Sequence, residues 1–476
     1  MIVQKIYDIM YQVPQHINTD KVFIVKKSEI NSRLDPKMAL YNQSVQHSLY
    51  PLVKLKSLLL SKPQYGANEA GLVREHKEQT RYIRITDIDE NGLISPDELG
   101  ATVANIDDKY ILNENDIVIA RSGATVGKAY IHKQLPYKCV YAGYLIRFVV
   151  DSEKILPDYL FAYTQLGPYK EWVNAIQRPS AQPNINAEEY QSLEIPLPNL
   201  SKQQEIVDYI NEVYTQKQAK EAEAQQLLDS IDDYLLKELG ITIPEIKTEI
   251  GNRIFIVQHS ELKGRYTPSL YKDAISLHST IYENIPLSHL AYVNPNTRLP
   301  YQDEKMVISF VPMESVNEMY AEINDNKDCT IAETKGFTRF QDGDLLWAKI
   351  TPCMENGKSA IAKDLINGYG CGSTEFHVIR PKNDNLLVEY IHSLLHMKFV
   401  RQTAKLYFGG SAGQQRVATD FLKNFNVPLP SIWKQKEIVD YIARIRIQAK
   451  TLREEGNIIL DDAKRKVEQM IIGESM

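Results

Sequence analysis

The sequence lacks the long apolar runs that membrane-spanning helices need. Its 476 residues are 43% hydrophobic and 24% charged, the composition of an ordinary soluble globular protein. No stretch approaches the ~18 consecutive apolar residues of a transmembrane helix. The start, "MIVQKIYDIMYQVPQ", has neither the apolar core nor the small-residue cleavage site of a secretory signal. We therefore expect a cytoplasmic protein of two or three domains, at roughly 150 residues per domain.

Cysteine is scarce, and the net charge shows no cationic excess. The four cysteines, Cys139, Cys329, Cys353 and Cys371, form no C-x-x-C pair, so we expect free thiols and no zinc site. His377 follows Cys371 by six positions, but two possible ligands do not make a metal site. The net charge of −6 argues against general coating of nucleic acid and leaves local DNA contact open.

Complete catalytic motifs are also missing. "GATVGKA" (123–129) has one residue too few between its glycines for a phosphate-binding P-loop, and Ala129 replaces the Mg²⁺-binding hydroxyl. We interpret it as a tight strand-to-strand turn with a basic tip. "NPNT" (294–297) departs from the N/D-P-P-[FY] tetrapeptide of amino-methyltransferases at two positions. "GYGCG" (368–372) lacks the strand-then-helix context of a dinucleotide fold, and "PEIK" (244–247) stands alone. We expect no catalytic site.

What the chain does have is an internal repeat. "PLPNLSKQQEIVDYI" (196–210) and "PLPSIWKQKEIVDYI" (428–442) are identical at 11 of 15 positions, 232 residues apart. At the same offset, "VFIVKKSEINSRLDP" (22–36) resembles "IFIVQHSELKGRYTP" (254–268). Asp116 and Arg121 have counterparts in Asp344 and Lys349. The order of these similarities is preserved, which indicates a tandem duplication whose copies have diverged most in their middles.

Each copy begins with a globule of mixed structure. Short β-branched and aromatic runs, bounded by Gly, Asn, Asp and Pro, predict strands at "YIRITDI", "DIVIA", "LIRFVV", "MVISFV" and "EFHVI". "PDYLFAYTQ" and "VEYIHSLLH" predict helices between them. Each globule is therefore expected to be α+β, with its own core. "PLP" then ends each globule, since proline continues neither a ladder nor a helix interior.

A long helix follows each globule. Ser201 is a candidate N-cap and Gly240 a candidate terminator of the first. In the second, apolar or small residues at 438, 442, 445, 449, 452, 456, 459 and 463 form a heptad seam, and Gly473 ends it. Residues 201–239 have a net charge of −5 and residues 433–472 one of +2. Narrow seams and opposite charges predict an antiparallel coiled coil, and thus a dumbbell of two globules on a helical bar with a pseudo-twofold axis.

Several predicted loops are rich in the types of side chain that contact DNA in other proteins. Arg, Asn and Gln read base edges, while Lys, Ser, Thr and amides near glycine bind phosphates. Such residues recur at matching places in both copies, which favours binding over an ordinary solvated surface. The candidate DNA-binding residues are Arg74, Lys77, Arg81, Arg84, Arg121, Ser122, Thr125, Lys128, Arg178, Gln182, Asn184, Lys349, Thr351, Lys358, Ser411, Gln414, Gln415 and Arg416.

Five stretches resemble one known family. "DIVIARSGATVGKAYI" is similar to the D-I-L-x-x-R-x-G-A-T-x-G-K signature of specificity (S) subunits of type I restriction-modification systems. "IPLPNLSKQQEIVDYI" and "VPLPSIWKQKEIVDYI" resemble the segment that opens each conserved spacer helix in that family. "RYIRITDI" and "SRLDP" resemble its domain openings. "ITPCMENGK" departs from the signature because it lacks Gly-Ala-Thr.

The resemblance implies a protein that performs no chemistry. Each globule would be a target-recognition domain that recognises half of a split, asymmetric site in double-stranded DNA, and the helical bar would fix the spacer between the halves. Two modification (methyltransferase) subunits would dock on the bar, and restriction/translocase subunits would join them. S-adenosylmethionine, ATP and Mg²⁺ would bind to these partners and not to this chain.

The resemblance and the repeat together give the expected domains and helix contacts. The domains are an N-terminal extension (1–21), target-recognition domain 1 (22–198), a central conserved spacer helix (199–240), a linker (241–253), target-recognition domain 2 (254–430) and a C-terminal conserved spacer helix (431–476). The residues expected to pair the helices or dock partners are Gln203, Ile206, Ile210, Leu228, Ile231, Leu235, Gln435, Ile438, Ile442, Ile445, Leu452 and Ile459.

Three alternatives remain open from the sequence. A methyltransferase or nuclease acting alone predicts turnover by the purified chain. A coiled-coil scaffold that never touches bases predicts that exchanging residues 60–190 for those of another allele leaves the methylated sites unchanged. A specificity subunit of a related system outside type I would differ only in its catalytic partner.

Overall fold

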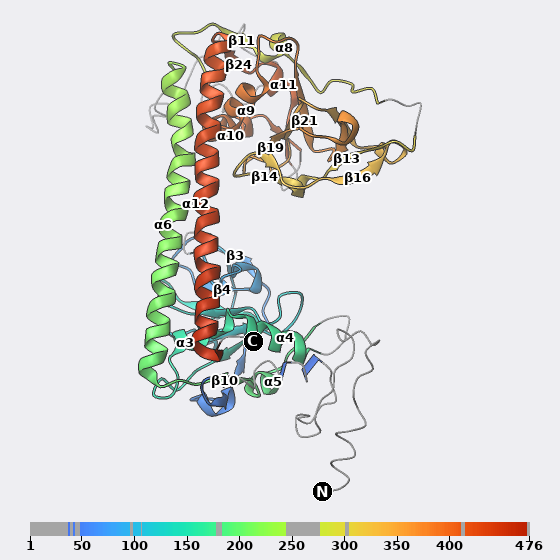
Figure 1. Ribbon diagram of the computed structural model, residues 1–476. Helices are drawn as coiled ribbons and strands as arrows, with labels where there is room; N and C mark the ends of the chain where they lie inside the picture. Colours follow the sequence, from blue (N-terminus) through green and yellow to red (C-terminus); the bar gives the residue numbers. More distant parts are fainter. Residues whose placement is uncertain are drawn as a thin grey trace. The chain divides into compact units, whose positions relative to one another are not determined.

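The computed structural model of the chain describes residues 37–38, 41–42, 48–95, 99–105, 107–177, 183–243, 277–299, 304–410 and 415–473. The chain divides into two compact units (Figure 1). Unit 1 comprises Met1–Gln218 and Gly456–Met476, and unit 2 comprises Ala219–Glu455. Each unit therefore contains one globule and a part of both long helices.

The globule of unit 1 is mixed α and β. Its strands are β1 (Leu52–Lys54), β2 (Gln64–Tyr65), β3 (Leu72–Val73), β4 (Arg81–Ile83), β5 (Ala101–Thr102), β6 (Ile117–Ala120), β7 (Ala129–Ile131), β8 (Cys139–Tyr141), β9 (Leu145–Phe148) and β10 (Glu194–Pro196). Its helices are α3 (Pro157–Thr164), α4 (Gly167–Ile176) and α5 (Ala187–Gln191), and α6 (Leu200–Glu238) follows.

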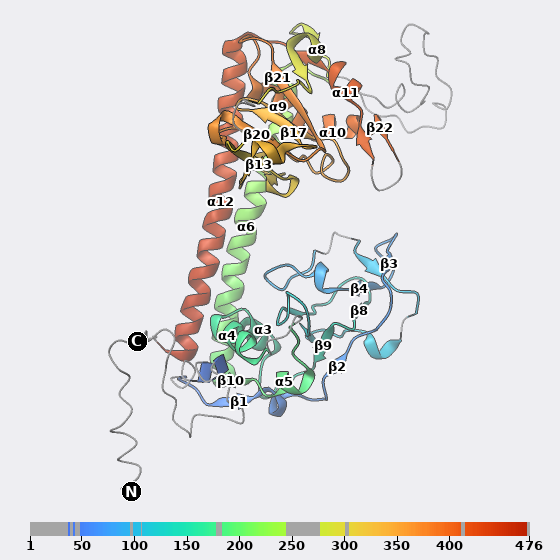
Figure 2. The ribbon, with the colours of Figure 1, turned by 90° about the vertical axis from the view of Figure 1, so that its right-hand side faces the viewer.

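The described part of unit 1 contains two four-stranded sheets, and Figure 2 labels β2 and β9 of one and β3, β4 and β8 of the other. Their strand orders are β2-β9-β6-β7 and β3-β5-β4-β8, and β1 pairs separately with β10. The strand β6 is buried at all four positions, which explains why "DIVIA" is a continuous apolar run without alternation. In the second sheet β4 and β8 run parallel, with Tyr82 opposite Val140.

The core of unit 1 joins the first sheet to the helices. Trp172 of α4 stacks on Tyr169 at a centroid distance of 6.2 Å and lies 5.7 Å from Tyr190. Ile206 and Ile210 of α6 are buried in the same cluster. Burying an apolar side chain of this size stabilises by about 1.5–3 kcal/mol, so the start of α6 is fixed to the globule.

Unit 2 repeats this arrangement. Its strands are β11 (Asn284–Pro286), β12 (Ala291–Val293), β13 (Val307–Val311), β14 (Val316–Asn317), β15 (Glu322–Ile323), β16 (Lys327–Thr330), β17 (Thr338–Gln341), β18 (Leu345–Ala348), β19 (Ser359–Ile361), β20 (Tyr369–Gly372), β21 (Phe376–Pro381), β22 (Phe408–Gly409), β23 (Arg416–Val417) and β24 (Asn426–Pro428). Its helices are α8 (Leu287–Leu290), α9 (Val388–His396), α10 (Lys398–Lys405) and α11 (Thr419–Lys423), and α12 (Ile432–Ile472) follows.

The sheets of unit 2 correspond to those of unit 1. The order β12-β21-β18-β19 matches β2-β9-β6-β7, and β16-β13-β20-β17 again contains one parallel pair, with Phe310 opposite Cys371. β11 pairs with β24 as β1 pairs with β10. The strands and the two short helices predicted from the sequence are confirmed, except that the end of "YIRITDI" forms a 3₁₀ turn over Ile85–Asp87.

A buried ion pair recurs in the first sheet of each unit. Asp344 is fully buried and accepts two hydrogen bonds from Arg380, at 2.6 and 2.7 Å. Its counterpart Asp116 lies 3.5 Å from Arg147, and burial raises the pKa of the Asp116 carboxyl. Each aspartate also accepts a hydrogen bond from the backbone at the start of the turn before it, Asp116 from the Asn113 N–H and Asp344 from the Gln341 N–H, both at 2.9 Å, so the repeated sequence here preserves the packing of turn and sheet.

The two long helices contact one another inside each unit. In unit 1 Gly456 of α12 lies against Lys217 of α6, and the Lys466 ammonium lies 4.5 Å from the Tyr209 ring centroid. In unit 2 Lys220 forms an ion pair with Glu455 at 2.7 Å. Further along unit 2, Tyr234 stacks on Tyr441 at 4.0 Å, and Lys434 pairs with Glu238 at 2.6 Å. Within each unit the two helices are therefore in antiparallel contact.

The ends of the helices show how their boundaries are set. The side chain of Asn199, and not that of the predicted N-cap Ser201, accepts a hydrogen bond from the Lys202 N–H at 2.9 Å. The cap falls two residues earlier than predicted because Leu200 is already helical. Gly240 and Gly473, the predicted terminators, have φ of +60° and +94°, a conformation that favours glycine.

Candidate nucleic-acid interface

Two loops that lie far apart in the sequence meet in unit 1. Ser122, in the turn after β6, forms an isolated β-bridge with Asn184. The Gly123 N–H donates to the Pro183 carbonyl at 3.1 Å, and the Ile185 N–H donates to the Arg121 carbonyl at 2.8 Å. The backbone therefore holds the candidate residues Arg121, Ser122 and Asn184 side by side.

Unit 2 contains the same junction. Ile350 forms an isolated bridge with Arg416. The Thr351 N–H donates to the Gln415 carbonyl at 3.0 Å, and the Val417 N–H donates to the Lys349 carbonyl at 2.9 Å. Because these bonds repeat those of unit 1, Asn184 and Arg416 occupy equivalent places in the two globules.

Aromatic side chains surround the junction in unit 1. The Arg121 guanidinium lies 4.9 Å from the Tyr65 ring centroid, and the Arg121 N–H donates to the Tyr144 carbonyl at 2.9 Å. The Tyr144 side chain is 63% exposed. A guanidinium next to the Tyr65 ring suits both base edges and base faces.

In unit 2 the positions equivalent to Tyr144 and Asn184 hold the charged residues Glu375 and Arg416. The Lys349 N–H donates to the Glu375 carbonyl at 2.9 Å, just as Arg121 does to Tyr144. The Glu375 carboxylate receives two hydrogen bonds from Arg416, from Nε at 2.8 Å and Nη2 at 2.7 Å. The bonded Arg416 guanidinium holds the pKa of the Glu375 carboxyl below its ordinary value.

A polar hollow adjoins the junction of unit 2. Its lining includes Asn294, Asn296, Thr297, Arg339 and Lys349, with Phe337 exposed at its rim. Amides, hydroxyls and cations are the groups that bind bases and phosphates. The hollow therefore extends the candidate interface beyond the residues found by sequence reasoning.

The turns themselves differ from the expected basic tips. The Lys128 ammonium donates to the Ile88 carbonyl, and the Lys358 ammonium donates to the Met313 carbonyl at 3.2 Å. Both lysines are half-buried, so they tie each turn to a neighbouring loop. Thr125 is exposed in its turn. Thr351 instead donates its hydroxyl proton to Glu355.

Arg74 and Arg81 were expected at the DNA surface, and the structure places both in the interior. The Arg74 side chain is 0% exposed, donates to the carbonyls of Gln79 and Leu99, and lies 4.1 Å from the Tyr137 ring centroid. Arg81 is equally buried and donates to the Ser95 carbonyl at 2.6 Å. Backbone carbonyls of folded-back loops surround these guanidiniums, so they hold the loops and reach no base.

The remaining candidates are distributed as follows. Arg84 is half-buried and forms an ion pair with Asp87 at 2.9 Å, and Lys77 lies on the surface. Gln415 contributes its backbone carbonyl to the junction. The candidates that lie outside the described residues are Arg178, Gln182, Ser411 and Gln414.

Gln203 and Gln435 were expected to pair the helices or dock partners, but in the structure they connect each long helix to its own globule. Both are 0% exposed, and their amides bond to the backbone of their own globules. Six other helix candidates are buried in the cores of their units and offer no surface to a partner: Ile206, Ile210, Ile231, Leu235, Ile438 and Ile442. Leu228, Ile445, Leu452 and Ile459 are half-buried.

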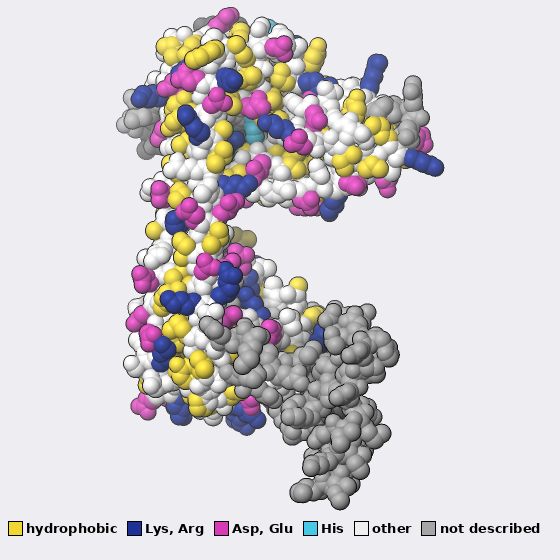
Figure 3. Space-filling model, viewed as in Figure 1, with side chains coloured by type: hydrophobic (Ala, Val, Ile, Leu, Met, Phe, Trp, Pro, Cys, Tyr) yellow, Lys and Arg dark blue, Asp and Glu magenta, His cyan; other side chains and the backbone are white. Residues whose placement is uncertain are grey.

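The helices also carry exposed side chains that the sequence analysis did not select. Trp433 is 79% exposed and Ile447 65% exposed, and they line a shallow surface on α12 with Lys436 and Arg444. Figure 3 shows cationic, anionic and hydrophobic side chains interspersed along the visible face of the long helices. This mixture is atypical of a phosphate-binding stripe.

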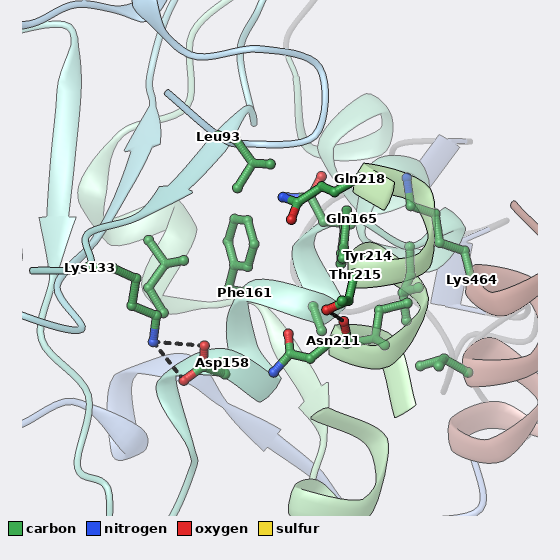
Figure 4. A pocket seen from close by; sticks show the side chains of 15 residues that line it. Leu93, Lys133, Asp158, Phe161, Gln165, Asn211, Tyr214, Thr215, Gln218 and Lys464 are labelled. Carbon is green, nitrogen blue, oxygen red and sulfur yellow. Dashed lines mark hydrogen bonds and ion pairs between the residues drawn. The ribbon is translucent and has the colours of Figure 1, made fainter. Parts of the chain in front are cut away.

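A second hollow lies in unit 1 between α3 and α6 (Figure 4). Phe161 of α3 faces Asn211 and Tyr214 of α6 across it, and Lys133 forms an ion pair with Asp158 at its edge, at 2.8 Å. Its walls are largely apolar, with amides around them. It is separate from the Ser122–Asn184 junction.

Several residues at the junctions were missed because they have no sequence signal of their own. Glu375 and Tyr144 are single residues at strand ends, and Tyr65 lies 56 residues before Arg121, whose guanidinium lies over its ring. Counting along the sequence does not align them, because Tyr144 lies 23 residues after Arg121 and Glu375 lies 26 residues after Lys349; only the matching backbone hydrogen bonds show that they are equivalent. No charge cluster or motif marks either one.

Metal and membrane sites were searched for in the described parts of the chain. Those parts contain no group of three His, Cys, Asp or Glu side chains suited to a metal ion. All four cysteines are free thiols, two of them buried. No helix in the described ranges is long and apolar enough to cross a bilayer.

Comparisons with known proteins identify the family of the chain. The family model described as "Type I restriction modification DNA specificity domain" matches residues 73–229 and 282–457. The "Type I restriction enzyme EcoEI specificity subunit" of Escherichia coli is 35% identical over 191 residues, which are 40% of this chain and 32% of the relative. The EcoAI specificity subunit of the same species is 34% identical over 197 residues, again 40% and 32%.

The chain spans about a third of the length of these two curated relatives. A solved structure, titled "Structural basis underlying complex assembly and conformational transition of the type I R-M system", aligns over 89% of this chain and 96% of its own. Its sequence identity is 15% and its TM-score 0.48.

Proposed function

The chain belongs to the family of type I restriction-modification DNA specificity proteins, and we propose that it selects the target of such a complex by reading a bipartite, asymmetric DNA site. One observation carries the proposal. Two loops separated by some 60 residues are brought together at the same place in both globules, through matching backbone bonds at Ser122–Asn184 and Ile350–Arg416.

The side chains at the two junctions differ, and this supports an asymmetric target. Domain 1 presents Arg121, Asn184 and Tyr144, whereas domain 2 presents Lys349, Arg416 and Glu375. Sequence is read by hydrogen bonds to base edges, so unlike side chains on a common frame specify unlike half-sites. The frame itself is preserved by the repeated ion pairs and glutamine contacts.

We propose that the long helices α6 and α12 set the distance between the two half-sites. Within each unit α6 and α12 contact each other in opposite directions, and we propose that these contacts continue as one antiparallel coiled coil along both helices. Such a bar would set the number of unread base pairs between the half-sites, and the two domains would form the ends of a pseudo-twofold dumbbell.

The same bar is proposed to dock two modification subunits. Its exposed faces mix apolar and charged side chains, and a repeated frame offers equivalent surfaces to two copies of one partner. Methyl transfer and DNA cleavage would then belong to the modification and restriction subunits, and this chain would act through binding alone.

Sequencing of methylated bases tests the proposal. The chain and its modification subunit are expressed in a methylation-free host, with a host lacking only this chain as control. Modified adenines at one split, asymmetric motif are expected, and none in the control. Methylation that persists without this chain would contradict a specificity role. Turnover by the purified chain alone would support a catalytic protein instead.

A further inference from the structure

Arg121 and Lys349 occupy equivalent positions in the two junctions, and both carry a positive charge. We infer, on the basis of the function proposed above, that these two side chains bind phosphates of the DNA backbone. Each domain would then be anchored on the duplex by a contact that does not depend on the target sequence, while the residues that differ between the junctions select the bases.

The repeat separates what the two junctions share from what differs between them. The Ile185 N–H donates to the Arg121 carbonyl at 2.8 Å, and the Val417 N–H donates to the Lys349 carbonyl at 2.9 Å. Both cations therefore extend from the same point of the backbone frame. The residues beside them have unlike side chains, namely Asn184 and Tyr144 in unit 1 and Arg416 and Glu375 in unit 2. Two half-sites of different sequence share only their phosphate backbone, so a charge kept in both copies suits the phosphates.

The Arg121 guanidinium is positioned without the use of its hydrogen-bond donors. It lies 4.9 Å from the Tyr65 ring centroid, and the Tyr65 hydroxyl accepts a hydrogen bond from the Ala187 N–H at 3.1 Å, which fixes the ring. Within the described part of the chain the guanidinium forms no hydrogen bond or ion pair, and its buried Nε has no partner. Burying unused donors of a cation costs free energy, and an anion from another molecule would offset that cost.

Lys349 is in the same condition in unit 2. Its side chain is half-buried at the polar hollow, yet its ammonium forms no hydrogen bond or ion pair with any residue of the described ranges. The Glu375 carboxylate is bonded instead to Arg416, at 2.8 and 2.7 Å. Asn296 and Thr338 line the same hollow, and amide and hydroxyl groups bind DNA phosphates together with lysine.

A structural role and a base-reading role explain the two cations less well. The backbone hydrogen bonds of the junction would form with any residue at these positions, and the charges stabilise no contact within the described residues. A contact kept by a planar guanidinium in one copy and a compact ammonium in the other depends on charge more than on shape. Phosphate oxygens accept hydrogen bonds from either cation.

The test measures how salt weakens DNA binding by the complex of this chain with its modification subunits. The dissociation constant is measured over a range of salt concentrations on two duplexes, one with the methylated motif of the wild-type complex and one without it. Arg121→Gln and Lys349→Gln each remove one cation, and Arg121→Lys keeps the charge but removes the planar fork. Lys154→Gln and Lys363→Gln are the controls in units 1 and 2, because each lysine forms an ion pair with a carboxylate outside the junction.

Arg121→Gln and Lys349→Gln should each reduce the slope of log affinity against log salt by about 0.9, the contribution of one phosphate contact. The affinity of each variant should therefore fall about threefold less than that of the wild type when salt rises from about 50 to about 200 mM. The same reduction is expected on both duplexes, because every sequence has phosphates. Arg121→Lys and the two controls should keep the wild-type slope, and sequencing of methylated bases should give the wild-type motif in every variant.

Two results overturn the inference while leaving the proposed function intact. One is a wild-type slope in Arg121→Gln and Lys349→Gln, whether or not their thermal unfolding temperature falls. The other is a motif that becomes relaxed at a single position in either variant, which would assign that cation to a base. A wild-type complex that methylates no motif and binds neither duplex would instead overturn the proposed function, and this inference with it.

Discussion

Gln203 and Gln435 make the same set of hydrogen bonds in the two units. The Gln203 Oε1 accepts from the Leu156 N–H at 2.8 Å, and its Nε2 donates to the Pro198 carbonyl at 2.9 Å. Gln435 bonds to Leu387 and Pro430 in the same way, at 2.9 and 3.0 Å. Each glutamine therefore fixes the start of a long helix to its own globule.

Removing this amide should destabilise the unit that contains it. Gln203→Ala leaves the Leu156 N–H and the carbonyls of Lys154 and Pro198 without their buried partner. We expect a loss of about 1–3 kcal/mol in the free energy of unfolding, measured by urea denaturation. Gln204→Ala is the control, because the neighbouring Gln204 is exposed and bonds only to Asp208. Equal losses of stability in the two variants would contradict the conclusion that Gln203 fixes the start of α6 to its globule.

The buried ion pair of unit 2 gives a second prediction. Asp344→Asn removes the charge from a carboxylate that is fully buried and bonded to Arg380. Breaking a buried pair on one side typically costs about 3–5 kcal/mol, so the thermal unfolding of unit 2 should shift strongly to lower temperature. Asp384→Asn, a change on the exposed surface of the same unit, should have little effect. A shift no larger than this control would show that Arg380 finds another partner.

Acid should destabilise unit 1 through His132. Burial lowers the pKa of His132 from 6.5 to about 4, so the folded state excludes a proton that the unfolded chain binds. The contribution of the neutral His132 to the free energy of unfolding is fully present above pH 6.5. It is lost as the pH falls from 6.5 toward 4, by about 3 kcal/mol at most. His132→Gln should flatten this decline in urea midpoints measured between pH 7.5 and 4.5. His289→Gln, at an exposed position, should preserve the wild-type slope, and an unchanged slope in His132→Gln would contradict the assignment.

The sequence revealed the repeat and most elements because these depend on local patterns. Runs such as "DIVIA" became buried strands, and the heptad positions of α12 became buried or half-buried. Arg74 and Arg81 were misplaced because a cation in a loop looks exposed until the tertiary fold returns backbone carbonyls to it. Glu375 was missed for the converse reason: its importance comes only from facing Arg416, 41 residues further along the chain.

The helical bar yields the most direct test of the account, which claims that two domains read separate half-sites at a separation set by α6 and α12. Seven residues are inserted into each helix, between Ala219 and Lys220 and between Glu454 and Glu455, to keep the heptad phase. Each insertion adds about 10 Å of helix, which corresponds to about three base pairs of DNA at 3.4 Å each.

The methylated motif of this lengthened chain, determined by single-molecule sequencing, decides the matter. The account predicts both half-sites unchanged and a spacer longer by about three base pairs. The original spacer, recovered with a folded and assembled variant, would contradict it.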